Sequence, residues 1–161
     1  SFTTIHPRTE LLLFLADRVQ HVKDLIQPEL DAGRIVLCDR FTDSTIAYQI
    51  GGRGFDPEMI DQLNYFSSFG YKPDLTFLLD VDYRVGIKRA TRHYEDRFEQ
   101  EAENFHHRIR QAYLNIQQRE PARVKYLDTT KNHVEIIQKT IRRILFETKL
   151  LGQVHTWWSH I

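Results

Sequence analysis

The stretch that decides the fold is Leu-Thr-Phe-Leu-Leu-Asp at residues 75–80, a short apolar run that ends in a carboxylate. Two other runs have the same form, Ile-Val-Leu-Cys-Asp at 35–39 and Val-Lys-Tyr-Leu-Asp at 124–128. Continuous rather than alternating apolarity is typical of a strand covered on both faces, as in a parallel sheet. Ligands of open α/β sheets bind at the carboxyl edge of the strands. We therefore expect the functional site just after Asp39, Asp80 and Asp128.

Helical patterns alternate with these runs, which predicts an α/β fold with a parallel sheet. Apolar residues recur at a 3.6-residue period from Leu11 to Ile26, Pro28 predicts a bend or restart, and Gly33 predicts the helix end. Asp56 and Pro57 have the form of an N-cap and first helical residue. The remaining expectations are a helix capped by Asp43 through Tyr48, a loop at Gly51–Gly54, and helices from Asp82 to Thr91, Glu99 to Arg119 and Val134 to Leu150, the last with Asn132 and Glu135 as a capping pair.

Composition bounds the class of protein. The 161 residues suit one domain, and the 22 basic residues equal the 22 acidic ones, which argues against a general nucleic-acid binder. The single cysteine, Cys38, cannot form an internal disulfide, so we expect a reducing, cytoplasmic compartment. No apolar run reaches the roughly 18 residues of a membrane span. We expect neither nucleic acid nor a membrane as partner.

The segment from Asp39 to Gln49 carries the densest chemistry. A carboxylate at a strand end can hold Mg²⁺ directly or through water, and the planar fork of Arg40 suits a phosphate. Thr45 and Gln49 are four residues apart and share a helix face, and the Gln49 amide can both donate to and accept from a nucleobase edge. The alternative is a strand end followed by an ordinary capped helix.

Two further segments contain arginines that could contact a nucleotide, residues 14–18 and 89–97. Phe14 and Arg18 are four apart on one helix face, where a ring can stack on a base and a guanidinium can donate to a carbonyl. Arg92 and Arg97 stand in a polar stretch that could close over phosphates. The alternatives are a core phenylalanine with a surface arginine, and a solvated turn with ion pairs.

Together these segments resemble the thymidylate kinase family, bacterial type, over about residues 9–140. The combination and order of the motifs carry the resemblance rather than any one of them. The motifs are ELLLFLADR at 10–18, DRF at 39–41 continuing to YQ at 48–49, GGRG at 51–54, PDLT at 73–76, LDV at 79–81, GIKR at 86–89 and DRFE at 96–99.

The resemblance implies transfer of the ATP γ-phosphoryl group to dTMP, giving dTDP, with Mg²⁺, in a homodimer. It implies that Phe14 stacks on thymine, that Arg18, Thr45 and Gln49 bind the base edge, and that Tyr48 lies against the deoxyribose. It further implies that Arg40 holds the acceptor phosphate, that Asp39 organises metal and water, and that the lid arginines Arg92 and Arg97 act at the transferring phosphoryl group.

The implied fold is a three-layer P-loop kinase-like parallel sheet with helices on both faces. Residues 1–150 would form the C-terminal two-thirds of the kinase domain, with a lid at about 89–98, and residues 151–161 a tail with Trp157 and Trp158. The G-x-x-x-x-G-K-[ST] pattern that cradles ATP phosphates does not occur in these residues, so we expect the first two strands to be missing. With two strand edges unpaired, we expect that the 161 residues alone are poorly stable, dimerise abnormally, or belong to a longer native chain. Without the loop we also expect them not to bind ATP productively.

Two other functions stay open. One is a catalytically dead domain that keeps a nucleotide-binding or dimerisation surface, which the absent phosphate loop favours. The other is a kinase for a different monophosphate, because Tyr48 and Gln49 indicate a deoxy-pyrimidine but do not separate dTMP from dUMP.

Overall fold

The described part of the chain begins with a long helical segment. The structure, a computed structural model, describes residues 5–90 and 99–148. Helix α1 (Pro7–His21) continues through a π-helical turn, η1 (Val22–Ile26), into α2 (Gln27–Asp31). The π turn ends at Ile26, two residues before Pro28, which has no N–H to donate to the preceding turn. The predicted bend is thus a local widening of the helix, and the chain leaves it at Gly33, whose φ of 74° favours glycine.

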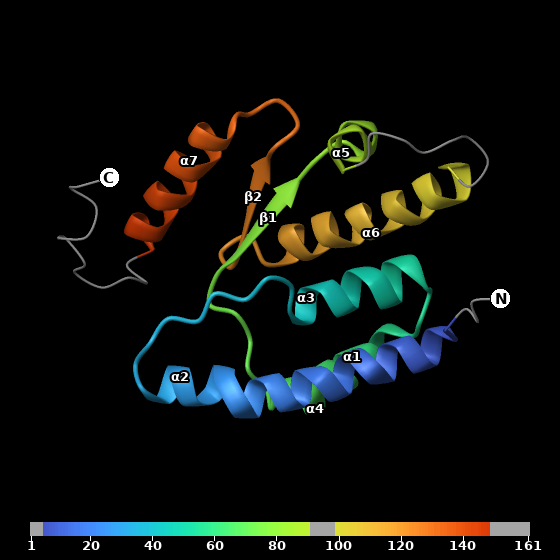
Figure 1. Cartoon of the computed structure of the whole chain (residues 1–161), viewed down its shortest axis with the longest axis vertical. Helices are drawn as coiled ribbons and strands as arrows, with labels where there is room; N and C mark the ends of the chain where they lie inside the picture. The colour runs from blue at the N-terminus through green and yellow to red at the C-terminus, as the bar shows by residue number, and fades with distance from the viewer. Residues whose placement is uncertain (1–4, 91–98, 149–161) are drawn as a thin grey trace.

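A second helical segment packs against the first. It consists of α3 (Thr42–Thr45), the π-helix η2 (Ile46–Gly52) and α4 (Pro57–Ser68). Asp56 caps α4 by accepting from the backbone N–H of Met59 at 2.8 Å, as predicted. The core of this half is Leu11, Leu15 and Ile60, all buried, with flanking side chains from η2 and α4. Figure 1 shows α1 and α4 side by side with the α3–η2 segment above them.

The other half holds the sheet. Strands β1 (Thr76–Asp80) and β2 (Val124–Asp128) pair in parallel from Thr76↔Val124 to Asp80↔Asp128. Two helices connect them, α5 (Tyr83–Ala90) and the long α6 (Glu99–Arg119), and α7 (Val134–Glu147) follows β2. In Figure 1, α6 and α7 flank the strand pair. The predicted parallel pairing and the bounds of α6 and β2 are confirmed.

The prediction of a strand at residues 35–39 is wrong. The segment has no strand pairing, and Leu37 is 97% exposed. A strand exists through its hydrogen bonds to a neighbour, and within residues 5–90 and 99–148 no strand lies beside this segment. The sheet of the described residues therefore has two strands rather than the three expected.

Three local predictions also need correction. Asp43 does not cap α3, because its carboxylate pairs with Arg123. Gly51 and Gly52 belong to η2 rather than to a loop. Asn132 makes no cap for α7, because its amide donates to the carbonyl of Asp128 at 2.7 Å. For Asp43 a tertiary partner 80 positions away takes the side chain that local spacing had assigned to a helix end, whereas for Asn132 the competing acceptor is a local backbone carbonyl.

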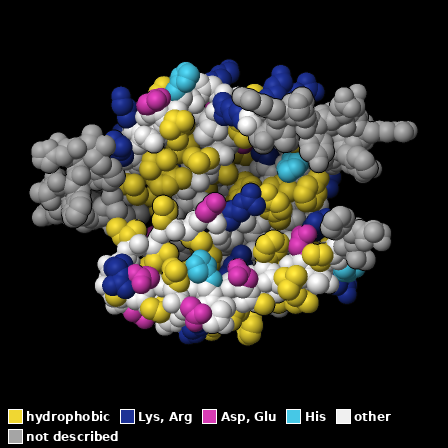
Figure 2. Space-filling model, in the orientation of Figure 1, with side chains coloured by type: hydrophobic (Ala, Val, Ile, Leu, Met, Phe, Trp, Pro, Cys, Tyr) yellow, Lys and Arg dark blue, Asp and Glu magenta, His cyan; other side chains and the backbone are white. Residues whose placement is uncertain are grey.

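The surface carries many apolar side chains. Figure 2 shows hydrophobic side chains gathered on one face of the molecule. The exposed large apolar side chains of the described residues include Ile35, Leu37, Val134 and Phe146. Among the helices within the described ranges, none has the length and apolarity needed to cross a bilayer.

Candidate functional site

Two stripes of functional side chains face each other across the helical half. On α1, Glu10, Phe14 and Arg18 follow at intervals of four residues and so share one face. On the α3–η2 segment, Thr45, Gln49 and Arg53 follow at the same interval. Arg18 bonds to Thr45 at one end, and Glu10 contacts both Gln49 and Arg53 at the other. The stripes therefore run antiparallel, with Phe14 on the stretch of α1 between the two sets of contacts.

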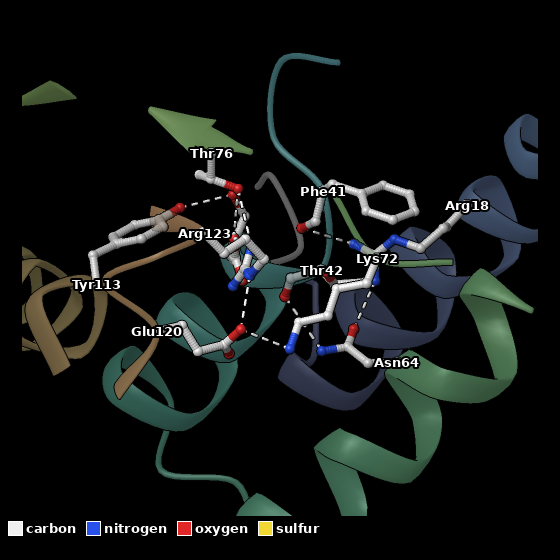
Figure 3. Close-up of polar contacts among 11 residues, drawn as sticks. Arg18, Phe41, Thr42, Asn64, Lys72, Thr76, Tyr113, Glu120 and Arg123 are labelled. Carbon is white, nitrogen blue, oxygen red and sulfur yellow. Dashed lines mark hydrogen bonds and ion pairs between the residues drawn. The ribbon is translucent and has the colours of Figure 1, made fainter. Parts of the chain in front are cut away.

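Arg18 is held by three hydrogen bonds. Its guanidinium donates to Asn64 Oδ1 at 2.7 Å and to the carbonyl of Phe41 at 3.2 Å (Figure 3). It also donates to Thr45 Oγ1 at 2.7 Å. Burial lowers the pKa of this guanidinium from its ordinary value. These bonds use three of the five N–H donors of an arginine. Arg18 is thus oriented by the fold and keeps donors for a ligand.

Gln49 is the most unusual polar residue of the site. Its side chain is 2% exposed, and its Nε2 lies 3.4 Å from Glu10 Oε1. Its Oε1 is buried and has no hydrogen-bond partner among the described residues. A buried acceptor without a partner costs free energy, and such groups in native proteins call for an explanation. Because η2 is a π-helix, a form frequent at functional sites, a ligand that donates to this oxygen is a direct explanation.

Arg40 and Tyr48 form a second part of the site. The Arg40 guanidinium lies over the Tyr48 ring, 5.3 Å from its centroid, and the Tyr48 ring meets Phe105 of α6 edge to face at 6.4 Å. Arg40 has a φ of 67°, a left-handed conformation that is uncommon for arginine. Asp39 lies in the same bend and is exposed. The bend therefore presents one guanidinium and one carboxylate together at the start of α3.

Hydrogen bonds from the sheet and from α6 hold the first turn of α3 in place. Arg123 donates to both oxygens of Asp43 at 2.8 Å, and both side chains are nearly buried. Thr76 Oγ1 also bonds to Asp43, and Ser44 Oγ lies 2.7 Å from the hydroxyl of Tyr113 on α6. Burial acts to lower the pKa of the Arg123 guanidinium, but its hydrogen bonds to Asp43 and Glu120 outweigh this and raise the pKa. Figure 3 shows this network and the Arg18–Asn64 contacts on opposite sides of residues 41–44.

The end of β1 is occupied by an internal ion pair. Asp80 accepts from Arg110 at 2.6 and 2.7 Å and from the Tyr126 hydroxyl at 3.0 Å. The hydrogen bond from Arg110 lowers the pKa of the Asp80 carboxyl. The Asp80 carboxylate is therefore committed to holding α6 on the sheet.

The structure brings together several of the predicted residues. Arg18 bonds to Thr45, and Gln49 follows Thr45 by four residues along the same helical segment. Arg40 lies over the ring of Tyr48. Phe14 is 58% exposed on the same face of α1 as Arg18. Arg92 and Arg97 lie outside the described residues, as does the tail from residue 151.

Sequence reasoning missed several residues of this site. Glu10 and Arg53 could have been found by extending the four-residue intervals from Arg18 and Gln49. Asn64 of α4, which bridges Arg18 and the Thr42 carbonyl, gives no local signal. Arg123 is 80 positions away from Asp43, so their pairing has none either.

Comparisons with known proteins show the family to which this chain belongs. A family model described as thymidylate kinase matches residues 2–141. Thymidylate kinases of Desulfovibrio desulfuricans and Pseudomonas putida are 45% and 48% identical, each over 138 residues, which cover 81% and 85% of this chain and 64% and 65% of those relatives. The crystal structure of thymidylate kinase from Ehrlichia chaffeensis is 32% identical with a TM-score of 0.71, covering 90% of this chain and 68% of that one. The chain spans about two thirds of the length of these relatives, and it belongs to the thymidylate kinase family.

Proposed function

We propose that this chain carries the acceptor side of a kinase that transfers the γ-phosphoryl group of ATP to dTMP, giving dTDP. The observation that carries the proposal is the line from Arg18 through Thr45 to Gln49, which ends in a buried carbonyl oxygen without a partner among the described residues. A pyrimidine edge with an N–H and carbonyl oxygens complements this line. The names of the relatives support the same reaction.

Arg40 is proposed to bind the acceptor phosphate. It lies at the start of α3, beside Tyr48, whose ring would lie against the deoxyribose. Phosphoryl transfer depends on positioning and positive charge rather than on a covalent intermediate. Arg40 would thus hold the acceptor oxygen in line, and Arg92 and Arg97 are proposed to supply further charge from the lid.

The donor set at Asp39 fits a magnesium ion that is shared with phosphates. Mg²⁺ is usually held by one or two carboxylates together with waters and substrate phosphates. Asp39 is exposed in the bend beside Arg40, where we propose that it holds the ion directly or through water. The ion, when bound, would neutralise charge on the phosphates.

ATP binding is proposed to need a phosphate loop. The pattern that cradles ATP phosphates does not occur in the 161 residues. We therefore expect these residues alone to bind dTMP without turning over ATP. A second candidate is a domain that binds a nucleotide without transferring phosphate.

Calorimetric titration with dTMP and with thymidine tests the acceptor site. We expect the chain to bind dTMP, and Arg40→Met to reduce the advantage of dTMP over thymidine by about tenfold or more, as expected for a charge-assisted bond. Glu29→Gln is the control, because Glu29 is a surface residue of α2 whose ion-pair partner is Arg34. A chain that binds neither ligand, or an Arg40→Met variant that keeps the full preference, would contradict the proposal.

Measuring dTMP-dependent ATP consumption separates the two candidate functions. The chain is assayed alone and preceded by the phosphate-loop segment of a relative. Turnover by the extended chain supports the kinase. Binding of dTMP without turnover in either form supports the second candidate.

A further inference from the structure

We propose that Glu10 is a positioning residue that holds the amide of Gln49 with its oxygen toward the base, and so selects a base edge that donates an N–H. The inference rests on the proposed function, because it assumes that a pyrimidine nucleotide occupies this site. It assigns to Glu10 the preference for thymine or uracil over cytosine.

The orientation of the Gln49 amide follows from the chemistry of its neighbour. A carboxylate has no proton to donate at neutral pH, so the group that Gln49 directs toward Glu10 is its NH₂. The Nε2–Oε1 distance between the two residues is 3.4 Å, which makes a long hydrogen bond. The other oxygen of Glu10 accepts from Arg53 at 3.0 Å, and the Arg53 guanidinium lies 5.3 Å from the centre of the Phe105 ring. Arg53 thus holds the Glu10 oxygen that does not face Gln49.

The contact with Glu10 fixes Gln49 Oε1 as a hydrogen-bond acceptor for the base. With Nε2 directed to Glu10, the buried Oε1 of Gln49 must accept from the ligand. Thymine and uracil present N3–H, whereas cytosine presents an unprotonated N3, which would place two acceptors against each other. Phe14 lies one turn from Glu10 and one turn from Arg18 on the same face, which suits a ring stacked along this line.

Glu10→Gln is the informative variant. A glutamine at this position can present its own NH₂ to Gln49, which frees the Gln49 amide to turn its NH₂ toward the base. The variant should therefore accept cytosine. Arg53→Met removes the partner of the second Glu10 oxygen and should loosen the amide in the same direction, and Glu29→Gln is again the surface control.

The experiment measures dissociation constants of dTMP and dCMP for the chain and each variant by calorimetric titration. We expect the chain to prefer dTMP, and Glu10→Gln to reduce that preference by about tenfold, the effect of one mispaired buried group. Arg53→Met should reduce it less and Glu29→Gln should leave it unchanged.

Three outcomes would overturn the inference. If Glu10→Gln weakens both nucleotides by the same factor, Glu10 has a structural role alone. If neither Glu10→Gln nor Arg53→Met changes the preference while dTMP still binds, the proposed function stands and the role of Glu10 does not. If the unchanged chain binds no dTMP, both the proposed function and this inference fail.

Discussion

Single polar residues in this chain acquire their roles from where they are buried. Gln49 and Asp80 are both buried, yet the first has an acceptor without a partner among the described residues and the second has bonds to Arg110 and Tyr126. A satisfied carboxylate stabilises the fold, whereas an unsatisfied amide oxygen is available to a ligand. The hydrogen bonds therefore distinguish these two buried polar residues where burial alone does not.

Glu120 should make stability depend on acidic pH. Its hydrogen bond from Arg123 lowers its pKa from 4.5 to about 2, and Lys72 adds a second contact at 2.7 Å. A depressed pKa contributes stability that is present above the unfolded value near 4.5 and is lost as pH falls toward 2. Because the side chain is one third exposed, we discount the shift for solvent screening and expect Glu120→Gln to cost about 1 kcal/mol at pH 7.

Urea unfolding at pH 7 and pH 3 measures this effect. The difference between the variant and the original chain should shrink at pH 3. Glu58→Gln, at an exposed position on α4, is the control. A difference that is equal at the two pH values would argue against a linked proton on Glu120.

At the scale of elements, the short helix α3 is held between two halves of the molecule. Arg18 and Asn64 bind it from the helical half, and Arg123, Thr76 and Tyr113 bind it from the sheet and α6. Four residues cannot form a stable helix on their own. The position of Thr45 and of the η2 residues that follow it depends on this clamp.

Breaking the Asp43–Arg123 pair should destabilise the chain strongly. Asp43→Asn or Arg123→Met leaves one nearly buried charge without its partner, which typically costs about 3–5 kcal/mol. The double variant should cost less than the sum of the two single changes. Chemical denaturation of all four proteins measures this coupling, and additive costs would contradict it.

Close packing of η2 on α6 should not tolerate a side chain at Gly51. A Cβ there would stand 2.7 Å from the Ala112 Cβ and 3.0 Å from the Arg108 carbonyl oxygen. We expect Gly51→Ala to cost about 1–3 kcal/mol, as overpacking does. Gly86→Ala in α5 is the control. Its Cβ would meet only the side chain of Val81, at 3.3 Å, and alanine favours the helix more than glycine does. Thermal unfolding that ranks Gly86→Ala below Gly51→Ala would contradict this packing.

At the scale of the whole molecule, the extended segment around Leu37 exposes apolar side chains. The sheet of the described residues has two strands, and Ile35 and Leu37, which pair with neither of them, are largely exposed. Extended apolar segments without a partner favour association. We therefore expect this segment to promote self-association.

Leu37→Lys should reduce self-association without loss of stability. Leu37 is almost fully exposed, so the substitution should change the free energy of unfolding by less than about 0.5 kcal/mol. Sedimentation velocity at increasing concentration should show a lower average mass for the variant. Thr9→Lys adds the same charge at an exposed position of α1 and is the control. A variant that associates like the original chain would show that this segment is not the contact.

Much of the fold could be predicted because its determinants are local. Asp56 and Pro57 predict the start of α4. Apolar periodicity predicts α1, and the apolar runs at 75–80 and 124–128 predict β1 and β2. The resemblance of several motifs to the thymidylate kinase family is confirmed by the family model over residues 2–141. Spacing alone also placed Phe14 and Arg18, and Thr45 and Gln49, on shared helix faces.

Other features were decided by the tertiary structure, because they depend on residues far apart in the sequence. An apolar run such as 35–39 becomes a strand only when another strand supplies hydrogen bonds, and no strand of the described residues does so. Asp43 fits a helix cap by spacing but pairs with Arg123, 80 positions away. The sequence by itself determined which segments are helical and which family the chain resembles, whereas the three-dimensional contacts of Glu10, Asn64 and Arg123 decided which side chains are free to bind.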